Sequence, residues 1–420
     1  MFSAPKPRSR LYTSFSTYAQ CAFTILTNAG LSGQADEFEK SMESLFPGSS
    51  VVPVSMARTG IYLVLRNTIK PGQKVILSPY TISDVVNMVL CAGGIPVFAD
   101  IEKGGTFNID PDEVKCLLEN ETNIGAVLVT HFYGLACQIE PILKMCQPYG
   151  IPVIEDAAQA FGTLIDGKHA GTIGYAGIFS FGLLKNVTGF LGGLVVTSDR
   201  ELAEKIRRDT ASFPPFPKKK VFQKMLKGMV FDFATSPLLF DSFVYWLFRY
   251  AYLHNMDFFK NKLDTDSKPR SYDVFPKDYA YRMWSVQGKI VQEQIPNRET
   301  QTLERIEQAK IYDSGLKEIP DLIRPPLRTD GSHLYIYYSI QCDQREELAR
   351  WMTQKYRDVQ ISHHRNCASM TCFSLYFRNC PNAENAGKSV LYLPTYPGYG
   401  IEQAQKNIEA IRTFFLKEAR

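Results

Sequence analysis

Short apolar segments alternate with helical patterns between residues 74 and 197. The helical pattern that follows the second segment carries a capping carboxylate, either Asp110 or Asp112, at its start. Strands that alternate with helices form a largely parallel sheet with helices on both faces. This alternation therefore predicts an α/β fold. The first four apolar segments are Lys74–Leu77, Pro96–Asp100, Ala126–His131 and Ile151–Asp156.

Three polar side chains follow the ends of two of the predicted strands. The strand 151–156 ends in Asp156, the strand 177–181 carries Ser180, and Lys185 comes five residues after that serine. Ligands of open α/β sheets bind at the carboxyl ends of the strands. There a carboxylate can pair with a protonated ring nitrogen, and a hydroxyl among small residues can bind a phosphate. An amine among apolar neighbours loses its charge easily and reacts with carbonyls. Together these groups indicate a pyridoxal-phosphate site.

The residues around these groups resemble a known family. The segment EDAAQAFG, followed by FSF and a lysine five residues after the serine, is similar to the DegT/DnrJ/EryC1/StrS sugar aminotransferases. The resemblance implies a fold-type-I pyridoxal-phosphate enzyme. Its large domain would be a three-layer αβα structure with a mostly parallel sheet, and a smaller α+β domain would follow.

The resemblance also implies a role for each residue of this segment. Lys185 would form the Schiff base with the cofactor, and Asp156 would pair with the pyridine nitrogen. Gln159 would lie against the ring, and Ser180 would hold the phosphate. Taken singly, the acid could instead cap a helix and the lysine could be solvated, but the joint spacing favours the cofactor site.

Two other segments match the family with changes. Ala57, Arg58 and Thr59 occupy the place of a Gly-Thr pair that binds the cofactor phosphate, at a turn between a strand and a helix that suits an anion. Arg58 could add a charge contact, and a plain turn is the alternative. The segment PYTI matches a loop that usually places an aromatic residue over the cofactor ring. Either Tyr80 or Ile82 could cover the ring here.

Five residues are candidates for contact with the substrate. His131 lies in the family-like segment HFYG, although a histidine satisfied at a strand end is the alternative. Tyr281 and Arg282 belong to a loop that reaches the partner subunit's site in relatives, but an alanine replaces the usual asparagine before them. His363 and His364 fall where relatives often place substrate-facing residues, with a solvated loop pair as the alternative.

The chain divides into four predicted segments. Phe38, Met42 and Leu45 recur at helical spacing within the first of them. A length of 420 residues is sufficient for a large enzyme domain with an appended small domain. The segments are a helical segment at 1–48, the pyridoxal-phosphate-binding large domain at 49–212, an aromatic-rich helical insertion at 213–277, and a linker helix with the C-terminal small domain at 278–420.

Residues 213–275 are rich in aromatic and apolar side chains. Asp232, Asp241 and Arg249 interrupt the apolar runs before about 18 residues accumulate, so the segment does not read as a bilayer span. It could be a buried helical insertion or a dimer interface. It could also lie on a membrane surface with its lysines toward anionic lipid. The third possibility is a wall of a pocket for an amphiphilic substrate.

Composition limits the compartment and the partners. A net charge of +4 on 420 residues does not argue for nucleic-acid binding. The nine cysteines include no CxxC pair, which predicts reduced thiols in a cytoplasmic protein. Cysteines 367, 372 and 380 lie near two histidines, but their spacing is not that of a zinc site, so no metal is expected. The first residues lack an apolar core with a cleavage site, and we expect no signal peptide.

The predicted reaction moves an amino group from an amino acid to a keto-sugar. Glutamate is the expected donor and a nucleotide-linked sugar the expected acceptor, in the biosynthesis of cell-surface polysaccharide, lipopolysaccharide or secondary-metabolite sugars. Lys185 argues against sugar dehydration, because relatives that dehydrate carry histidine there. The resemblance also implies a homodimer with shared active sites. The alternatives are a cofactor-bound regulatory or membrane-associated scaffold, and an enzyme for lipid-linked or other amphiphilic substrates. Peripheral contact with the inner membrane face would be made through residues 213–275.

Overall fold

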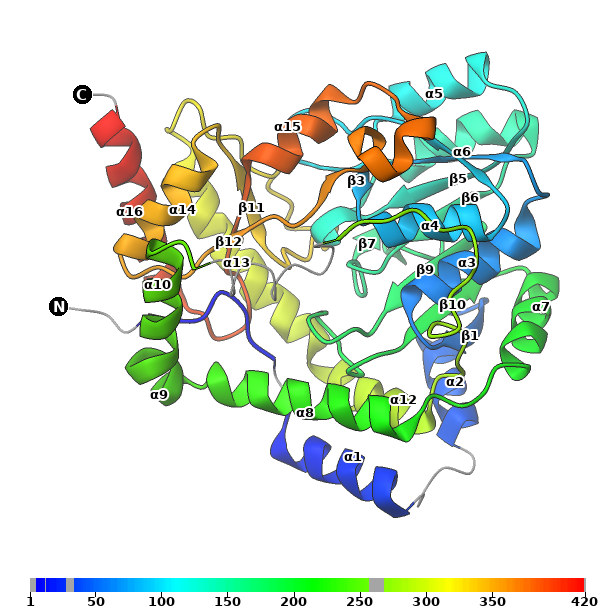
Figure 1. Cartoon of the computed structure of the whole chain (residues 1–420), viewed down its shortest axis with the longest axis horizontal. Coiled ribbons are helices and arrows are strands. Elements are labelled where there is room, and N and C mark those ends of the chain that lie inside the picture. Colours follow the sequence, from blue (N-terminus) through cyan, green and yellow to red (C-terminus); the bar gives the residue numbers. More distant parts are fainter. Residues whose placement is uncertain (1–4, 12, 28–33, 257–267, 419–420) are drawn as a thin grey trace.

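The computed structural model describes residues 5–11, 13–27, 34–256 and 268–418 (Figure 1). Its largest sheet has seven strands in the order β1-β10-β9-β6-β5-β2-β4. These strands are β1 (Ser50–Val54), β2 (Lys74–Leu77), β4 (Ile95–Phe98), β5 (Ile124–Thr130), β6 (Val153–Asp156), β9 (Ala176–Ser180) and β10 (Gly193–Thr197).

The seven-stranded sheet is mostly parallel. Strands β4, β2, β5, β6 and β9 pair in parallel, while β10 runs antiparallel to both of its neighbours. Because parallel strands must be joined by crossovers, helices connect them and come to cover the sheet. The α/β fold predicted from the alternation of strands and helices is confirmed.

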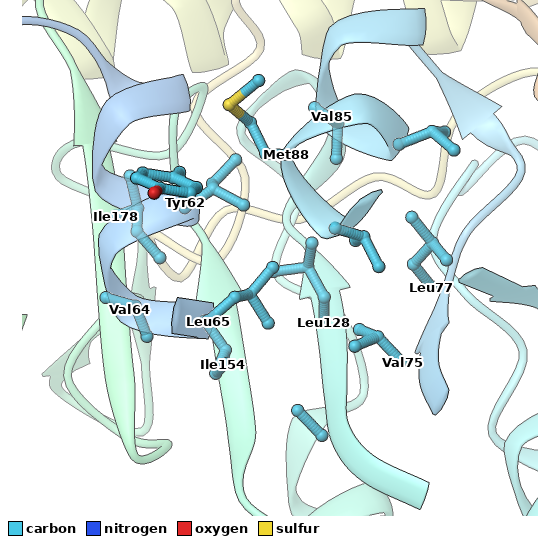
Figure 2. Packing of buried hydrophobic residues seen from close by; sticks show 14 of the residues in the cluster. Tyr62, Val64, Leu65, Val75, Leu77, Val85, Met88, Leu128, Ile154 and Ile178 are labelled. Carbon is cyan, nitrogen blue, oxygen red and sulfur yellow. The ribbon is translucent and has the colours of Figure 1, made fainter. Parts of the chain in front are cut away.

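Helices cover both faces of this sheet. Successive residues of a strand point to opposite faces, so Val75 and Leu77 of β2 face one layer and Ile76 faces the other. Figure 2 shows the first layer, where Leu65 and Met88 belong to the same buried cluster as the strand residues. The helices around the sheet are α2 (Gln34–Leu45), α3 (Ala57–Thr68), α4 (Ser83–Cys91), α5 (Pro111–Asn120), α6 (Ile139–Cys146) and α7 (Arg200–Ala211).

Local signals explain where two of these helices begin. The Asp110 side chain accepts the backbone N–H of Asp112 at 2.9 Å, and a proline occupies the first turn of α5. Asp199 caps α7 in the same way. Phe38 and Met42 bury one face of α2 against the sheet, and Leu45 packs beside them, as their spacing predicts.

A long helix leads from the large sheet to a second core. Helix α13 (Arg298–Leu316) follows α12 (Ser285–Gln294) and packs against α16 (Ile401–Glu418). The second core surrounds a three-stranded sheet of order β11-β14-β12. Its other elements are β11 (Tyr338–Gln341), α14 (Arg345–Gln354), β12 (Gln360–Ile361), α15 (Pro381–Ser389) and β14 (Val390–Leu393).

Short elements complete the described chain. Strand β3 (Tyr80–Thr81) pairs with β13 (Arg365–Asn366), which joins two segments far apart in the sequence. Strand β7 (Leu164–Ile165) pairs with β8 (Lys168–His169). The short helices are η1 (Phe132–Gly134), η2 (Gln147–Tyr149), η4 (Ile295–Asn297), η5 (Cys367–Ser369) and η6 (Thr371–Tyr376).

The aromatic-rich insertion forms helices at the periphery of the molecule, with α8 along the bottom of the view and α9 and α10 at its left side (Figure 1). They are α8 (Lys218–Ala234), α9 (Pro237–Leu239), the π-helix η3 (Phe240–Val244) and α10 (Tyr245–Leu253), and α1 (Phe15–Thr27) packs against α8. Within the described part of the chain, no helix combines the length and apolar character needed to cross a membrane. Residues 257–267 of the predicted insertion lie outside the described residues, and the division into four segments stays a prediction.

Candidate active site

Asp156 ends β6 at the carboxyl edge of the large sheet. It is buried, and its Oδ1 accepts the backbone N–H of Ala158 at 3.0 Å. Burial raises the pKa of Asp156, while the Ala158 N–H and the charge of Lys185 act in the opposite direction. Among the described residues, no side chain donates a hydrogen bond to this carboxylate.

Lys185 lies in the loop that follows β9 and is partly buried. Burial lowers its pKa to about 8, against the attraction of Asp156, and the positive charge of Arg58 lowers it further. Asp156 and Lys185 therefore act on each other's charge, as two groups facing one site do. Strands β6 and β9 are neighbours, with Asp156 paired to Ile178, so the two loops that follow these strands meet at one edge.

Ser180 occupies the end of β9 beside these two groups. Its hydroxyl is partly buried and accepts the backbone N–H of Gly182 at 3.3 Å. The hydroxyl proton remains available to an acceptor, and the small residue next to it leaves room for a bulky anion. The geometry suits a phosphate oxygen.

The start of α3 brings a charged residue to the same edge. Helix α3 begins at Ala57. The residue before it, Met56, forms an isolated β-bridge with Gly192, which directly precedes β10. Arg58 forms an ion pair with Asp84 and donates to the hydroxyl of Tyr279 at 2.9 Å. The positive charge of Arg58 also acts on Lys185 and lowers the pKa of that amine.

Thr59 faces the protein and not the open edge of the sheet. It is fully buried, and its hydroxyl donates to the backbone carbonyl of Tyr279 at 3.0 Å. Ser55 donates to the same carbonyl at 2.8 Å. The two hydroxyls hold the segment around residue 279 against the start of α3.

Gln159 lies at the carboxyl edge on a tight turn after β6. Its Oε1 accepts the backbone N–H of Tyr133 at 3.1 Å, which orients the side-chain amide. Tyr133 adopts a left-handed backbone conformation with φ of 53°, which is uncommon for a residue with a side chain. The amide nitrogen of Gln159 keeps its donors for another partner.

Tyr80 and Ile82 occupy different surroundings. The Tyr80 ring is fully buried and is surrounded by the rings of Phe107, Phe132 and His364 at centroid distances of 5.3 to 5.7 Å. Its faces are thus covered by protein. Ile82 is only partly buried and precedes α4 at the carboxyl end of the sheet. This arrangement favours Ile82 as the residue that would cover a cofactor ring.

The histidine candidates are also enclosed by protein. His131 is buried, and its two ring nitrogens contact Glu155 at 2.9 Å and the backbone N–H of Cys137 at 3.1 Å, so the structural alternative fits it better. His364 is buried next to His363, with ring centroids 4.3 Å apart. Burial lowers the pKa of His364 well below the usual value, and the charges of His363 and Lys185 act in the same direction.

Tyr281 and Arg282 lie near the start of α8. The Tyr281 ring packs on Phe216, and the Lys220 amine lies 4.9 Å from its centroid. Arg282 is exposed, and its backbone N–H donates to the carbonyl of Pro214 at 2.9 Å. The structure therefore groups them with the insertion and not with Asp156.

Two networks near the site were not predicted. The hydroxyl of Tyr133 contacts that of Tyr392 at 2.6 Å, and Ser362 lies 2.9 Å from the Tyr80 hydroxyl. Around Arg58, Asp84 accepts the hydroxyl of Tyr272 at 2.6 Å. The HFYG segment was a signal for the first network, but no local pattern marks the other members.

The donor set fits pyridoxal phosphate. A buried carboxylate with acceptor capacity suits a protonated ring nitrogen, and an amine with a lowered pKa suits an aldehyde carbon. Ser180 and Arg58 supply a hydroxyl and a positive charge for the phosphate. No group of three or more His, Cys, Asp or Glu side chains in the described ranges could hold a metal ion, and all nine cysteines are free thiols.

Comparison with known proteins agrees with this chemistry. The model of the DegT/DnrJ/EryC1/StrS aminotransferase family matches residues 25–230 and 253–412. The spore coat polysaccharide biosynthesis protein SpsC of Bacillus subtilis (strain 168) is 29% identical over 390 residues, which cover 90% of this chain and 89% of that protein. GDP-perosamine synthase of Vibrio cholerae is 33% identical over 174 residues, or 41% of this chain and 47% of that protein.

A solved structure shows the same fold over the full length. The aminotransferase from Psychrobacter cryohalolentis superposes with a TM-score of 0.76 at 17% identity, covering 99% of this chain and 100% of that one. At 17% identity the superposition shows that the two chains share a fold. The evidence for a shared chemistry comes from the family match. The chain belongs to the DegT/DnrJ/EryC1/StrS aminotransferase family and is a fold-type-I, pyridoxal-phosphate-dependent aminotransferase.

Proposed function

We propose that this enzyme transfers the amino group of an amino acid, with glutamate as the expected donor, to a nucleotide-linked keto-sugar. The product would serve cell-surface polysaccharide or related sugar biosynthesis, as the names of SpsC and GDP-perosamine synthase imply for those relatives. The observation that carries the proposal is the pair of Asp156, at the end of β6, and Lys185, in the loop after the neighbouring strand β9, which act on each other's charge.

Asp156 and Lys185 would have different roles in the reaction. Bound pyridoxal phosphate supplies a ring that withdraws electrons from the substrate carbon. Asp156 would hold a proton on the nitrogen of the bound ring. Lys185 would hold the cofactor through its amine and, when that amine is free, would carry a proton to and from the substrate α-carbon. With a pKa of about 8, roughly a tenth of this amine is neutral near pH 7.

The remaining candidates position the cofactor. Ser180 and the start of α3 at Ala57 would bind the phosphate, with Arg58 adding a positive charge. Gln159 would present its amide to the ring oxygen, and Ile82 would cover the ring. Thr59 would act indirectly, because its hydroxyl is committed to the carbonyl of Tyr279.

The assembly and the compartment are part of the same proposal. We infer a homodimer with shared active sites, on the resemblance to the family. Nine free thiols among the described residues fit a reducing compartment, which supports the cytoplasm. Residues 213–275 would bring the enzyme to the inner face of the membrane.

A spectroscopic experiment tests the enzymatic role. The purified protein should absorb visible light, and added glutamate should bleach that absorption. With ¹⁵N-labelled glutamate and a panel of nucleotide-linked keto-sugars, mass spectrometry should find labelled amino-sugar. Lys185→Ala should remove both results, whereas Lys168→Ala, which changes an exposed lysine, should keep them. Cofactor binding without bleaching by any amino donor would support the non-catalytic scaffold instead.

A further inference from the structure

The helices of the insertion expose an unusual share of the apolar surface. Among the described residues, 25 large hydrophobic side chains are exposed, and 13 of them lie on α1 and on α8 to α10. A few scattered exposed apolar side chains are normal, but a contiguous group marks a site of interaction. Figure 1 places α1 beside α8 along the bottom of the view, and α9 and α10 turn from the end of α8 up the left side. We refer to these helices, including η3 between α9 and α10, as the outer helix surface.

Helix α8 has two separate apolar faces. Its inner face buries Val221, Met225 and Gly228 in the protein. Its outer face carries a stripe in which neighbouring positions are three or four residues apart, so the side chains lie on one side of the helix. Phe233 in this stripe is 70% exposed. The other exposed members are Phe222, Leu226, Met229 and Val230.

The stripe continues onto the next helices. Leu238 of α9 is 87% exposed, which means that it projects into solvent. On η3 and α10, Phe243, Trp246, Leu247 and Tyr250 are exposed at the same helical spacing. Aromatic side chains such as Trp246 and Tyr250 combine an apolar body with a polar tip and favour the boundary between lipid and water.

The outer helix surface is also the positively charged part of the chain. Residues 218–253 contain five lysines and one arginine against two aspartates, a net charge of +4 that equals the net charge of all 420 residues. Asp232 accepts the Tyr18 hydroxyl at 2.6 Å and is thereby engaged within the protein. Lys220 pairs with Asp278. Three exposed lysines of α8 have no carboxylate partner in the described ranges: Lys218, Lys219 and Lys227.

The outer helix surface is both apolar and positively charged, and a partner must complement both properties. We propose that the outer helix surface docks on a bilayer that contains anionic lipid, with the helices lying in the plane of the membrane. Contact between two copies of this surface would bring +4 against +4, whereas an anionic bilayer complements the charge and accepts the apolar stripe. The absence of a membrane-crossing helix in the described ranges agrees with binding at the surface.

The family match covers only part of the outer helix surface. The family model leaves residues 231–252 unmatched and begins only at residue 25, so α9, η3, α10 and most of α1 lie outside it. Helix α8 lies within the match up to residue 230, so the match sets apart only the other helices of this surface. Within the molecule, a side chain added at Gly228 on the inner face of α8 would meet Phe190 at 3.1 Å and Leu183 at 3.2 Å. Docking would thus bring the loop that carries Lys185 to within one helix of the bilayer.

Vesicle binding tests the proposal on the full-length holoenzyme. Vesicles of phosphatidylcholine with about a third phosphatidylglycerol should pellet the protein, and pure phosphatidylcholine should pellet much less of it. Added salt should weaken the binding. The emission of Trp246, one of three tryptophans, should shift to shorter wavelength on the anionic vesicles, and Trp246→Phe should remove most of this shift.

Two pairs of matched variants separate the apolar and the charge contributions. Phe233→Glu with Leu238→Glu should lower the partition coefficient more than tenfold. Leu375→Glu with Phe377→Glu changes two equally exposed apolar residues elsewhere and should leave it unchanged. Lys218→Glu with Lys219→Glu should also lower it more than tenfold. Lys103→Glu with Lys144→Glu, which reverses two exposed lysines elsewhere, should have little effect.

The outcomes separate the possible occupants. The proposal would be overturned if the wild type and the Phe233→Glu, Leu238→Glu variant pelleted equally with anionic vesicles. It would also be overturned if the wild type pelleted with neither kind of vesicle. If neither protein binds vesicles and light scattering shows a smaller assembly for the variant, the surface is an interface between copies of the chain. Transaminase activity is not part of this readout, so the docking proposal and the proposed reaction can fail separately.

Discussion

His131 and Glu155 form a fully buried pair, with Nε2 of the imidazole 2.9 Å from Oε2 of the carboxylate. The other ring nitrogen, Nδ1, accepts the backbone N–H of Cys137 at 3.1 Å. Since Nδ1 is an acceptor, the ring carries its proton on Nε2 and donates it to Glu155. This pair joins the end of β5 to the end of β6.

Glu155 also organises the turn before β9. Its oxygens accept the backbone N–H groups of Gly171, Ile173 and Gly174 at 2.6 to 2.8 Å. Burial opposes the charged form, but the donors from His131 and the turn outweigh it and lower the pKa of Glu155. Successive residues of a strand face opposite sides. The adjacent carboxylates therefore have different roles: Glu155 holds structure, and Asp156 faces the candidate site.

Glu155→Gln should lower the stability of the protein. The new NH₂ group cannot accept a hydrogen bond, so at least one buried N–H group loses its partner, at a cost of about 2–4 kcal/mol. The denaturant midpoint should fall, while Glu119→Gln on the exposed side of α5 should leave it unchanged. The lowered pKa means that the charged form of Glu155 stabilises the fold above about pH 4 and loses this effect in acid. Equal midpoints for the two variants would contradict the structural role.

Asp156→Asn should weaken catalysis while the protein stays folded. Burial already disfavours the charged form of Asp156, so a neutral amide removes that penalty and the denaturant midpoint should be equal or slightly higher. Turnover should fall by about 100-fold or more, because the ring nitrogen loses its acidic partner. A loss of stability that parallels the loss of activity would identify Asp156 as a structural acid instead.

Lys185→Met should stabilise the cofactor-free protein in a pH-dependent manner. The folded pKa of about 8 lies below the ordinary value of 10.5, so the unfolded chain binds more protons between these values. The free energy of unfolding of the wild type should therefore rise over this range relative to the variant. The variant's advantage should be about 1–3 kcal/mol near pH 7 and should vanish above pH 10.5. Lys168→Met, at an exposed position, should show no such trend. A constant difference across the range would contradict the buried amine.

The sequence was sufficient for the elements that local signals define. The strand Lys74–Leu77 has the predicted bounds, and Asp110, one of the two predicted capping carboxylates, caps α5. Both depend on residues within one element, where apolar periodicity and capping chemistry act directly. The sequence also predicted that the acid, the serine and the lysine lie at one edge of the sheet. Parallel strands such as β6 and β9 end at the same edge, so the residues that follow them come close together.

The environment of the site could not be read in that way. The Tyr80 hydroxyl contacts Ser362, which is 282 residues away, and Tyr272 reaches Asp84 across 188 residues. Such contacts depend on the pairing of β3 with β13 and on the path of the chain after the insertion. A sequence pattern within one helix or strand does not predict them. For the same reason the sequence left Tyr80 and Ile82 as equal candidates, whereas the packing of the Tyr80 ring distinguishes them.

Gly177→Ala should be severely destabilising, although it lies in a strand and not in a turn. A Cβ atom at Gly177 would lie 1.9 Å from the backbone oxygen of Gly171, and backbone cannot move aside as a flexible side chain can. We expect a loss of about 3 kcal/mol or more in the free energy of unfolding. Gly182→Ala is the matched control, because its nearest neighbours would be Ser180 Oγ at 3.5 Å and the Lys185 side chain at 3.8 Å, which is ordinary contact.

The Gly177 position also tests the turn held by Glu155. Gly171 donates its N–H to Glu155 at 2.7 Å, so displacement of Gly171 by a new Cβ would break the same bond that Glu155→Gln weakens. The double variant should therefore lose less stability than the sum of the two single losses, by about 0.5–3 kcal/mol in a denaturation cycle. Strict additivity would show that Gly171 and Glu155 act independently, and a fall no greater than that of Gly182→Ala would show that β9 can shift to admit the methyl group.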